Sequence, residues 1–466
     1  MKYIVNIISF LLGITAYSQI VSKAEIVTRT STVVEMASEF FPREKRLIKI
    51  SLPKGYDKAK KYPVIYTLDG NSLFDMVTAY SQILGKQTIE EDGYDYGTNV
   101  IPPVIVVGIF HNDRNLETEP NFNGLDYLEK PNNLKNFIIS EVVPYIDSNY
   151  TTSGYNSIIG HSNTAYFTTN LLFQEENPFK SIIALSLTEG STAFYEKLIE
   201  KLNTKVDGSY FLGYGRKDNE FNCIAKKIEA HVSNKNVLVK KFNSNHSDLP
   251  ASSLVDAIKY LFNDYRNFND FNKAIRNTDF EIVEYLSTYE DKIKSKYGIK
   301  TQVLEDDYGS LLDETVSSKN IEVFNKLVEY DEKKNDFEYP LIILFHYRKD
   351  IGDNQEAKNI AYKILESNDE NVYKFLVNKQ IDVFTNFFVE NLNSLKEAIR
   401  FLEIGKKKYP EKELAFAYFI AKISIENNYQ LDKGKVNLRF CTENYKKNWY
   451  FTKSDLERLN EKFTRY

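Results

Sequence analysis

Ser162 stands in a setting that favours nucleophilic chemistry. Residues 157–160 are typical of a strand, the letters GHSNT follow at 160–164, and a helical pattern begins at once. A strand, a tight turn and a helix in this order form a nucleophile elbow, which lifts a serine hydroxyl clear of the sheet. The usual pattern is G-x-S-x-G, and Thr164 replaces its last glycine. The alternative interpretation is a serine that only caps a helix.

A general base must come from one of five histidines. They are His111, His161, His231, His246 and His346. In an elbow of this type, the acid and then the histidine follow the serine, each after a later strand. His246 lies downstream of Ser162 in a turn just past the predicted strand 237–242. It is therefore the predicted base, whereas His231 and His346 lie in helical patterns and His161 is expected to pack.

Two carboxylates are candidates for the triad acid. The predicted strand 210–214 runs into GRKDNE at 215–220, which places Asp218 and Glu220 in the turn that follows. Asp218 is the first choice and Glu220 the alternative, because a triad is defined by geometry and not by position. Asp248 is too close to His246 in sequence to be preferred.

Such a triad would cleave an ester through an acyl-enzyme. His246 takes the Ser162 proton, the acid orients the imidazole, and water releases the acyl group. The developing oxyanion needs backbone N–H donors. Asn163 is one candidate because it follows the nucleophile, and Asn71, in the turn after the predicted strand 64–68, is the favoured second.

Six segments carry a family resemblance. They are RLIKISLPKGY (46–56), YPVIYTLDG (62–70), VIVVGIFHNDR (104–114), FIISEVVPYIDSNY (137–150), IIGHSNT (158–164) and HSDLPASSLVDAIKYLF (246–262). In this order they resemble the putative-esterase family of α/β-hydrolases, which includes enterochelin-esterase-like and S-formylglutathione-hydrolase-like enzymes. The resemblance implies that Ser162 is the nucleophile and His246 the base. It also implies a small-molecule, glycan or siderophore ester as substrate, with no metal or other cofactor.

The elements that must position these residues alternate between strands and helices. Strands are predicted at residues 46–52, 64–68, 104–109, 157–160, 182–186, 210–214 and 237–242, and helices at 133–150, 165–174 and 254–265. Such alternation predicts an α/β fold with a mostly parallel sheet between helices. We expect this α/β-hydrolase domain at residues 24–266.

The chain changes character after this domain. Apolar residues recur at spacings of three and four, which predicts an all-helical domain at residues 267–466. The octapeptides DFEIVEYL (279–286) and NIEVFNKL (320–327) indicate a repeat, and KEAIRFLEIGKKKYP (396–410) resembles a helix of a tetratricopeptide repeat. An irregular helical bundle is the alternative. We expect this domain either to bind a protein partner or to form a lid over the pocket.

Composition and the N-terminus narrow the remaining classes. With 60 basic and 65 acidic side chains, the net charge of −5 argues against a nucleic-acid partner. Two cysteines, Cys223 and Cys441, exclude a disulfide scaffold, and whether they pair stays open. Residues 1–18 are typical of a signal peptide, so the mature protein is expected to be exported, periplasmic or secreted, without a membrane span. A catalytically degenerate scaffold protein and an acyltransferase are the alternatives to an esterase.

Overall fold

The computed structural model describes residues 31–464 apart from 86, 89–94, 97–98, 205, 207, 219–221, 267–270, 278, 302, 304 and 336–337. The chain forms two compact units, each described by itself. The first is Met1–Asn267 together with Asp291–Thr301, and the second is Phe268–Glu290 together with Gln302–Tyr466. The predicted signal peptide lies outside the described residues.

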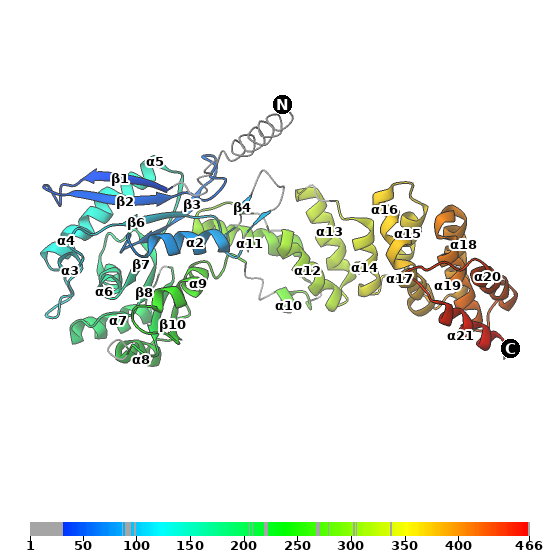
Figure 1. Cartoon of the computed structure of the whole chain (residues 1–466). Helices are drawn as coiled ribbons and strands as arrows, with labels where there is room; N and C mark the ends of the chain where they lie inside the picture. Colours follow the sequence, from blue (N-terminus) through cyan, green and yellow to red (C-terminus); the bar gives the residue numbers. More distant parts are fainter. Residues whose placement is uncertain are drawn as a thin grey trace, which may run out of the picture. The chain divides into compact units, whose positions relative to one another are not determined.

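An eight-stranded sheet forms the centre of the first unit (Figure 1). Its spatial order is β1-β2-β6-β3-β7-β8-β9-β10. The strands are β1 (Ser31–Ala37), β2 (Lys45–Ser51), β3 (Tyr62–Thr67), β6 (Ile105–Ile109), β7 (Thr152–His161), β8 (Phe179–Leu185), β9 (Tyr210–Gly215) and β10 (Val237–Phe242). β2 runs antiparallel to β1 and β6, and the other pairs are parallel. A separate ribbon pairs β4 (Gln87–Thr88) with β5 (Asp95–Tyr96).

All seven predicted strands are present, and the predicted α/β fold is confirmed. β1 is an additional strand that the sequence analysis did not predict. It is an edge strand that pairs only with β2, and most of its residues are exposed. A strand of this kind lacks the continuous apolar run that marks strands buried on both faces.

Helices cover both faces of the sheet. The helices α4 (Glu129–Asn136), α5 (Val143–Asn149), α6 (Asn163–Asn170), α7 (Thr192–Thr204) and α8 (Asn222–His231) contribute to one core with alternate strand residues such as Tyr66 and Ile158. The other strand residues, such as Ile65 and Ile159, are equally buried. They point to the opposite face, where α2 (Phe74–Leu84) and α9 (Leu249–Leu261) pack together.

Two predicted helices differ from the structure in detail. The predicted helix 133–150 is α4, the π-helical turn η1 (Phe137–Val142) and α5 in sequence. α9 begins at Leu249, earlier than the predicted start at residue 254, and has a proline in its first turn. Proline suits that position because the first N–H groups of a helix have no partner within it.

The strand order reverses beside β3. From β3 the chain crosses to β6 on one side and later returns to β7 on the other side. Ligands of open α/β sheets bind at the carboxyl ends of the strands where the order reverses. The turn that carries Asn71 follows β3, and Ser162 follows β7, so the two predicted site segments leave adjacent strand ends.

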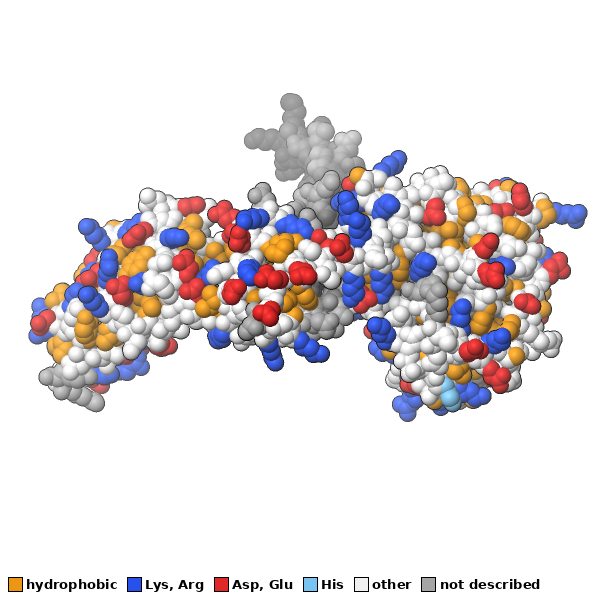
Figure 2. Space-filling view, turned by 180° about the vertical axis from the view of Figure 1, so that it is seen from behind, with side chains coloured by type: hydrophobic (Ala, Val, Ile, Leu, Met, Phe, Trp, Pro, Cys, Tyr) orange, Lys and Arg blue, Asp and Glu red, His pale blue; other side chains and the backbone are white. Residues whose placement is uncertain are grey.

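The second unit is all-helical, as predicted. Its helices are α10 (Phe271–Ala274), α11 (Ile282–Tyr297), α12 (Glu305–Ser317), α13 (Ile321–Asn335), α14 (Leu341–Ile351), α15 (Asn354–Glu366), α16 (Glu370–Phe375), α17 (Ile381–Asn386), α18 (Leu395–Lys408), α19 (Glu413–Glu426), α20 (Leu431–Glu443) and α21 (Lys453–Phe463). On the face shown in Figure 2, acidic and basic side chains are interspersed. The tetratricopeptide-like repeat stays a prediction.

The last part of α11, from Asp291 onward, belongs to the first unit. Tyr297 is fully buried, and its ring lies 4.8 Å from that of Tyr155 and 5.4 Å from that of Phe262. Lys296 forms an ion pair with Asp264. The first unit thus consists of Met1–Asn267 and Asp291–Thr301, and the domain bounds 24–266 and 267–466 stay a prediction.

The two cysteines are both free thiols in the structure. Cys223 on α8 is exposed, and Cys441 on α20 is buried. Burial raises the pKa of the Cys441 thiol to about 12. Within the described part of the chain, no helix combines the length and apolar character needed to span a bilayer.

Candidate active site

Ser162 occupies a strained turn between β7 and α6. Its φ of 63° and ψ of −124° lie in a region that costs a non-glycine residue about 1–3 kcal/mol. Its N–H donates to Leu185 O at 2.9 Å. A Cβ on Gly160 would lie 2.2 Å from Thr164 O, so only glycine allows the helix to approach the strand this closely. The elbow geometry is therefore present with threonine at its last position.

His246 and Asp218 are brought together as the sequence analysis proposed. His246 Nδ1 lies 3.1 Å from Asp218 Oδ2. The Asp218 side chain is 4% exposed and that of His246 is 34% exposed. Because the carboxylate holds Nδ1–H, Nε2 is the ring nitrogen left to accept a proton. Ser186, with a positive φ of 49°, donates its hydroxyl hydrogen bond to the same Asp218 oxygen.

Two loops place this pair. A Cβ on Gly215, at the end of β9, would lie 2.6 Å from Ser244 O, so glycine lets the loop that carries Asp218 approach the loop that carries His246. Asn245 Oδ1 accepts the Asp248 N–H, and Asp248 Oδ1 accepts the Asn245 N–H. Asp248 therefore closes the turn around His246.

His161 does more than the packing expected of it. Its Nε2 lies 2.9 Å from His246 O, and the two rings are 4.7 Å apart. Burial lowers the pKa of His161, and the nearby His246 lowers it further, to about 4. A neutral imidazole with a proton on Nε2 can donate this bond at neutral pH. The contact joins residues 85 positions apart in the chain, so no local sequence pattern could reveal it.

His161 links the two halves of the candidate site. It precedes Ser162 in the chain and contacts the backbone of His246. The hydrogen bonds of the described residues do not include one between Ser162 Oγ and His246. Catalytic hydrogen bonds often form only when substrate is bound. Glu220, the alternative acid, lies outside the described residues.

Both predicted oxyanion donors are available. Within the described part of the chain, neither the Asn71 N–H nor the Asn163 N–H donates a hydrogen bond. The neighbouring groups are occupied, because the Gly70 N–H donates to Ile109 O and the Ser72 N–H to Asp69 O. Asn71 thus presents a free donor in an otherwise bonded turn.

A buried ionic network beside the turn after β3 was not predicted. Both terminal nitrogens of Arg46 donate to Glu117, at 2.7 and 2.8 Å. His111 Nδ1 donates to Glu117 Oε2 at 3.2 Å, and the Asp69 N–H donates to His111 Nε2 at 3.3 Å. Burial alone would raise the pKa of Glu117, but the bonds from Arg46 and His111 and the Arg46 charge lower it to about 2. The network anchors the turn that carries Asn71.

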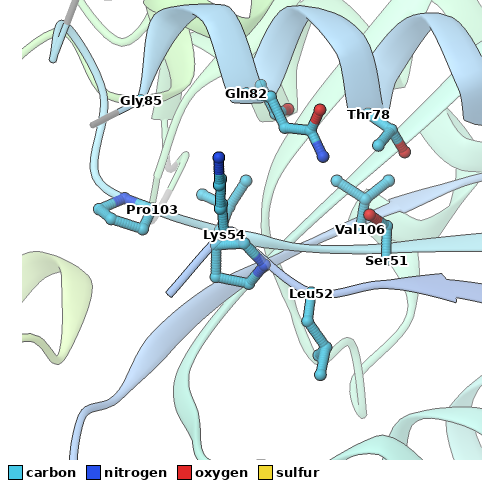
Figure 3. A pocket seen from close by; sticks show the side chains of 11 residues that line it. Ser51, Leu52, Lys54, Thr78, Gln82, Gly85, Pro103 and Val106 are labelled. Atoms are coloured by element: carbon cyan, nitrogen blue, oxygen red, sulfur yellow. The ribbon is translucent and has the colours of Figure 1, made fainter. Parts of the chain in front are cut away.

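One pocket lies away from these residues. Figure 3 shows it between α2 and the strands β2 and β6, lined in part by Lys54, Thr78 and Gln82. None of the predicted catalytic or oxyanion residues lines it. We therefore do not assign it to the chemistry of Ser162.

Comparison with known families agrees with the geometry. Residues 40–236 match the family model described as putative esterase. This segment belongs to that family. The esterase segment contains Ser162 and Asp218 but ends before β10 and His246. The place of His246 beside Asp218 is therefore an observation of the structure and not of the family model.

Several solved structures are similar to this chain, and the first of them shares its fold. An uncharacterised protein from Capnocytophaga ochracea is 18% identical, with a TM-score of 0.53, and the match covers 72% of this chain and 94% of that one. An IroE-like serine hydrolase from Shewanella oneidensis (19% identity, TM-score 0.46) matches over 64% and 96% of the two chains. A siderophore hydrolase from Aspergillus nidulans is 15% identical, with a TM-score of 0.40, and the match covers 51% of this chain and 95% of that one. No curated protein matches the chain.

Proposed function

We propose that this esterase is a serine carboxylic-ester hydrolase with Ser162, His246 and Asp218 as its triad. The observation that carries the proposal is the 3.1 Å bond between His246 Nδ1 and the buried Asp218, on a chain whose Ser162 occupies an elbow with a φ of 63°. A serine that only capped a helix would need neither the strained backbone nor a histidine–carboxylate pair. The match of residues 40–236 to an esterase family supports the same activity.

The proposed reaction has two halves. His246 Nε2 takes the Ser162 proton while Oγ attacks the ester carbonyl, and the oxyanion accepts the N–H groups of Asn163 and Asn71. The C–O bond then breaks, and His246 returns its proton to the leaving alcohol. In the second half His246 takes a proton from water, which attacks the acyl-enzyme carbonyl. The bond between that carbon and Ser162 Oγ then breaks, His246 returns its proton to Oγ, and the carboxylic acid leaves. Asp218 stabilises the imidazolium in both halves.

A fluorophosphonate probe and p-nitrophenyl acetate test the proposal directly. The wild type should be labelled and should turn over, and Ser162→Ala and His246→Ala should do neither above roughly a thousandth of the wild-type rate. Two exposed residues, Ser148 and His231, offer matched controls, and Ser148→Ala and His231→Ala should retain activity. Labelling that persists in Ser162→Ala, or a wild type without turnover, would contradict the triad and favour a scaffold role.

The acceptor of the acyl group and the natural ester substrate need separate assays. The proposed substrate is a small-molecule ester, and siderophore lactones and acylated sugars are the two classes to compare. An alcohol added to the assay should leave the yield of free acid unchanged if water is the acceptor. A new ester product would instead indicate acyl transfer.

Export is part of the proposal. The motivation is the N-terminal sequence, in which an apolar run and small residues precede Gln19. Expression of the full chain in its natural host should yield an exported protein that begins at Gln19 by mass spectrometry. A cytoplasmic protein that retains residues 1–18 would contradict it.

A further inference from the structure

Thr164 departs from the elbow pattern and makes a contact that glycine cannot make. Its side chain is fully buried. Its hydroxyl oxygen accepts the His161 N–H at 2.7 Å, and its single hydrogen faces two acceptors at 2.8 Å, Asp69 Oδ2 and His161 O. The carboxylate is the stronger acceptor because it is charged, and His161 O already accepts from Arg114 Nη2. A glycine at this position has no side chain with which to reach either group. The substitution therefore adds a bond between the elbow and the turn after β3, two segments 95 residues apart in sequence.

The Asp69 carboxylate is the other end of this contact. Its residue is 4% exposed and has a positive φ of 55°. Arg114 Nε donates to Oδ1 at 2.6 Å and Arg114 Nη2 to Oδ2 at 3.2 Å, while Nη2 also donates to His161 O at 2.9 Å. Both backbone groups of His161 are thus held, the N–H by Thr164 and the carbonyl by Arg114.

The bond joins the two segments that carry the proposed oxyanion donors. Asn163 immediately precedes Thr164, and Asn71 is two residues beyond Asp69. Asp69 O accepts the Ser72 N–H and the Leu73 N–H, both at 2.9 Å, so the turn is closed around Asn71. A shift of Asp69 relative to Thr164 would therefore move one donor relative to the other.

Oxyanion stabilisation depends on donors that are fixed before the reaction begins. The loss of a single donor costs roughly 10²–10³ in kcat in a measured case, and the donors act within a narrow range of distances. A neutral hydroxyl that donates to a buried carboxylate forms a strong, directional hydrogen bond. The Thr164–Asp69 bond is placed to preserve the spacing of the two donors.

We propose that Thr164 is a positioning residue, whose hydroxyl bond to Asp69 holds the Asn71 and Asn163 N–H groups at the spacing that an oxyanion requires. The inference rests on the proposed function of Ser162. It predicts that a change of Thr164 to glycine, the residue of the usual elbow pattern, impairs the enzyme.

The test compares variants that differ in this hydroxyl. Thr164→Val is nearly isosteric and lacks the donor, so kcat for p-nitrophenyl acetate should fall roughly 10- to 100-fold while KM changes less than about 2-fold. Thr164→Ser keeps the hydroxyl and should stay within about 3-fold of the wild type. Thr164→Gly should lose activity like the valine variant. Thr168 is the matched control, because it is equally buried on α6 and its hydroxyl donates to Ala165 O within the same helix, and Thr168→Val should be neutral.

Inhibition by a trifluoromethyl ketone provides a second test, because a purely structural role of Thr164 would leave the strength of inhibition unchanged. Its adduct with Ser162 carries an oxyanion, so Thr164→Val should weaken its inhibition by about the same factor as kcat/KM falls. If the valine variant does not fold, Thr164→Ala takes its place in both assays. Equal kcat and inhibition in the wild type, the valine or alanine variant and the serine variant would overturn the positioning role. A wild type that neither turns over nor reacts with the ketone would instead overturn the proposed function.

Discussion

His161 donates a hydrogen bond from Nε2 to the backbone carbonyl of His246, at 2.9 Å. The residue before the candidate nucleophile thus holds the turn of the candidate base. Replacing His161 by Leu removes the donor and should lower kcat/KM roughly 5- to 10-fold, the value of one ordinary hydrogen bond. His161→Gln, whose amide can donate from a similar place, should lose less. Equal activity of both variants and the wild type would show that the contact has no part in positioning His246.

The same contact predicts an unusual titration. Because the pKa of His161 is about 4, its ring should stay neutral as the pH falls from 7 to 5. In NMR spectra of the protein with ¹⁵N-labelled histidine, its resonances should therefore change only near pH 4. Assignment follows from the resonance that disappears in His161→Gln. A midpoint close to 6.5 would contradict the burial of this ring.

The choice of acid is tested by two amide substitutions. Asp218→Asn keeps the shape but reverses the hydrogen-bond preference toward His246, so kcat should fall on the order of 10⁴-fold, as in a well-studied triad protease. Glu220→Gln should change kcat less than about 3-fold. Steady-state assays with p-nitrophenyl acetate measure both. If the Glu220 variant shows the larger loss, the acid is Glu220.

Ser186 should act through Asp218. It is fully buried, and its hydroxyl donates to the oxygen that also faces His246. Ser186→Ala should lower kcat/KM about 5- to 30-fold, equivalent to about 1–2 kcal/mol for a hydrogen bond to a charged group. Ser253 is equally buried on α9, its hydroxyl donates to Leu249 O within that helix, and it is the control. If Ser253→Ala loses as much activity, the effect of Ser186 is general destabilisation.

Acid should destabilise the fold through Glu117. Its pKa is about 2 in the folded protein against 4.5 in the unfolded chain, so its contribution is complete above about pH 4.5 and declines as the pH falls toward 2. Between pH 5 and pH 3 it accounts for about 2 kcal/mol of the loss in unfolding free energy. Urea denaturation of Glu117→Gln should show that much less pH dependence, on a lower overall stability because Arg46 stays buried without its partner. Glu176→Gln, at an exposed site, should keep the wild-type slope.

The end of α11 should stabilise the first unit. Tyr297→Ala removes a buried ring that packs on Tyr155 and Phe262, and should cost roughly 3–5 kcal/mol of unfolding free energy. Lys294→Ala, at an exposed position of the same helix, should cost less than about 0.5 kcal/mol. Urea denaturation followed by circular dichroism compares them. A small loss in Tyr297→Ala would mean that Asp291–Thr301 adds little to this unit.

The sequence was sufficient to predict the features that depend on local residue patterns and on the order of elements along the chain. The buried strands show as apolar runs, so all seven predicted strands were found, whereas the exposed edge strand β1 was missed. The turn at Ser162 was predictable from the strand and the helix on either side of it. The proximity of His246 and Asp218 was predictable because parallel strands bring the turns that follow them to one edge of the sheet.

Only the tertiary structure decided which side chains meet across that edge. The contacts of Thr164 with Asp69, Arg46 with Glu117 and His161 with His246 join residues 95, 71 and 85 positions apart. Such contacts depend on strand order, on the close approaches at Gly160 and Gly215, and on the positive φ of Ser162 and Asp69. Neither the strand order, nor the close approaches, nor the positive φ values produce a periodic pattern or a fixed residue spacing in the sequence. For this reason Thr164 reads in the sequence as a departure from the elbow pattern, and in the structure as the residue that bonds the elbow to the neighbouring turn.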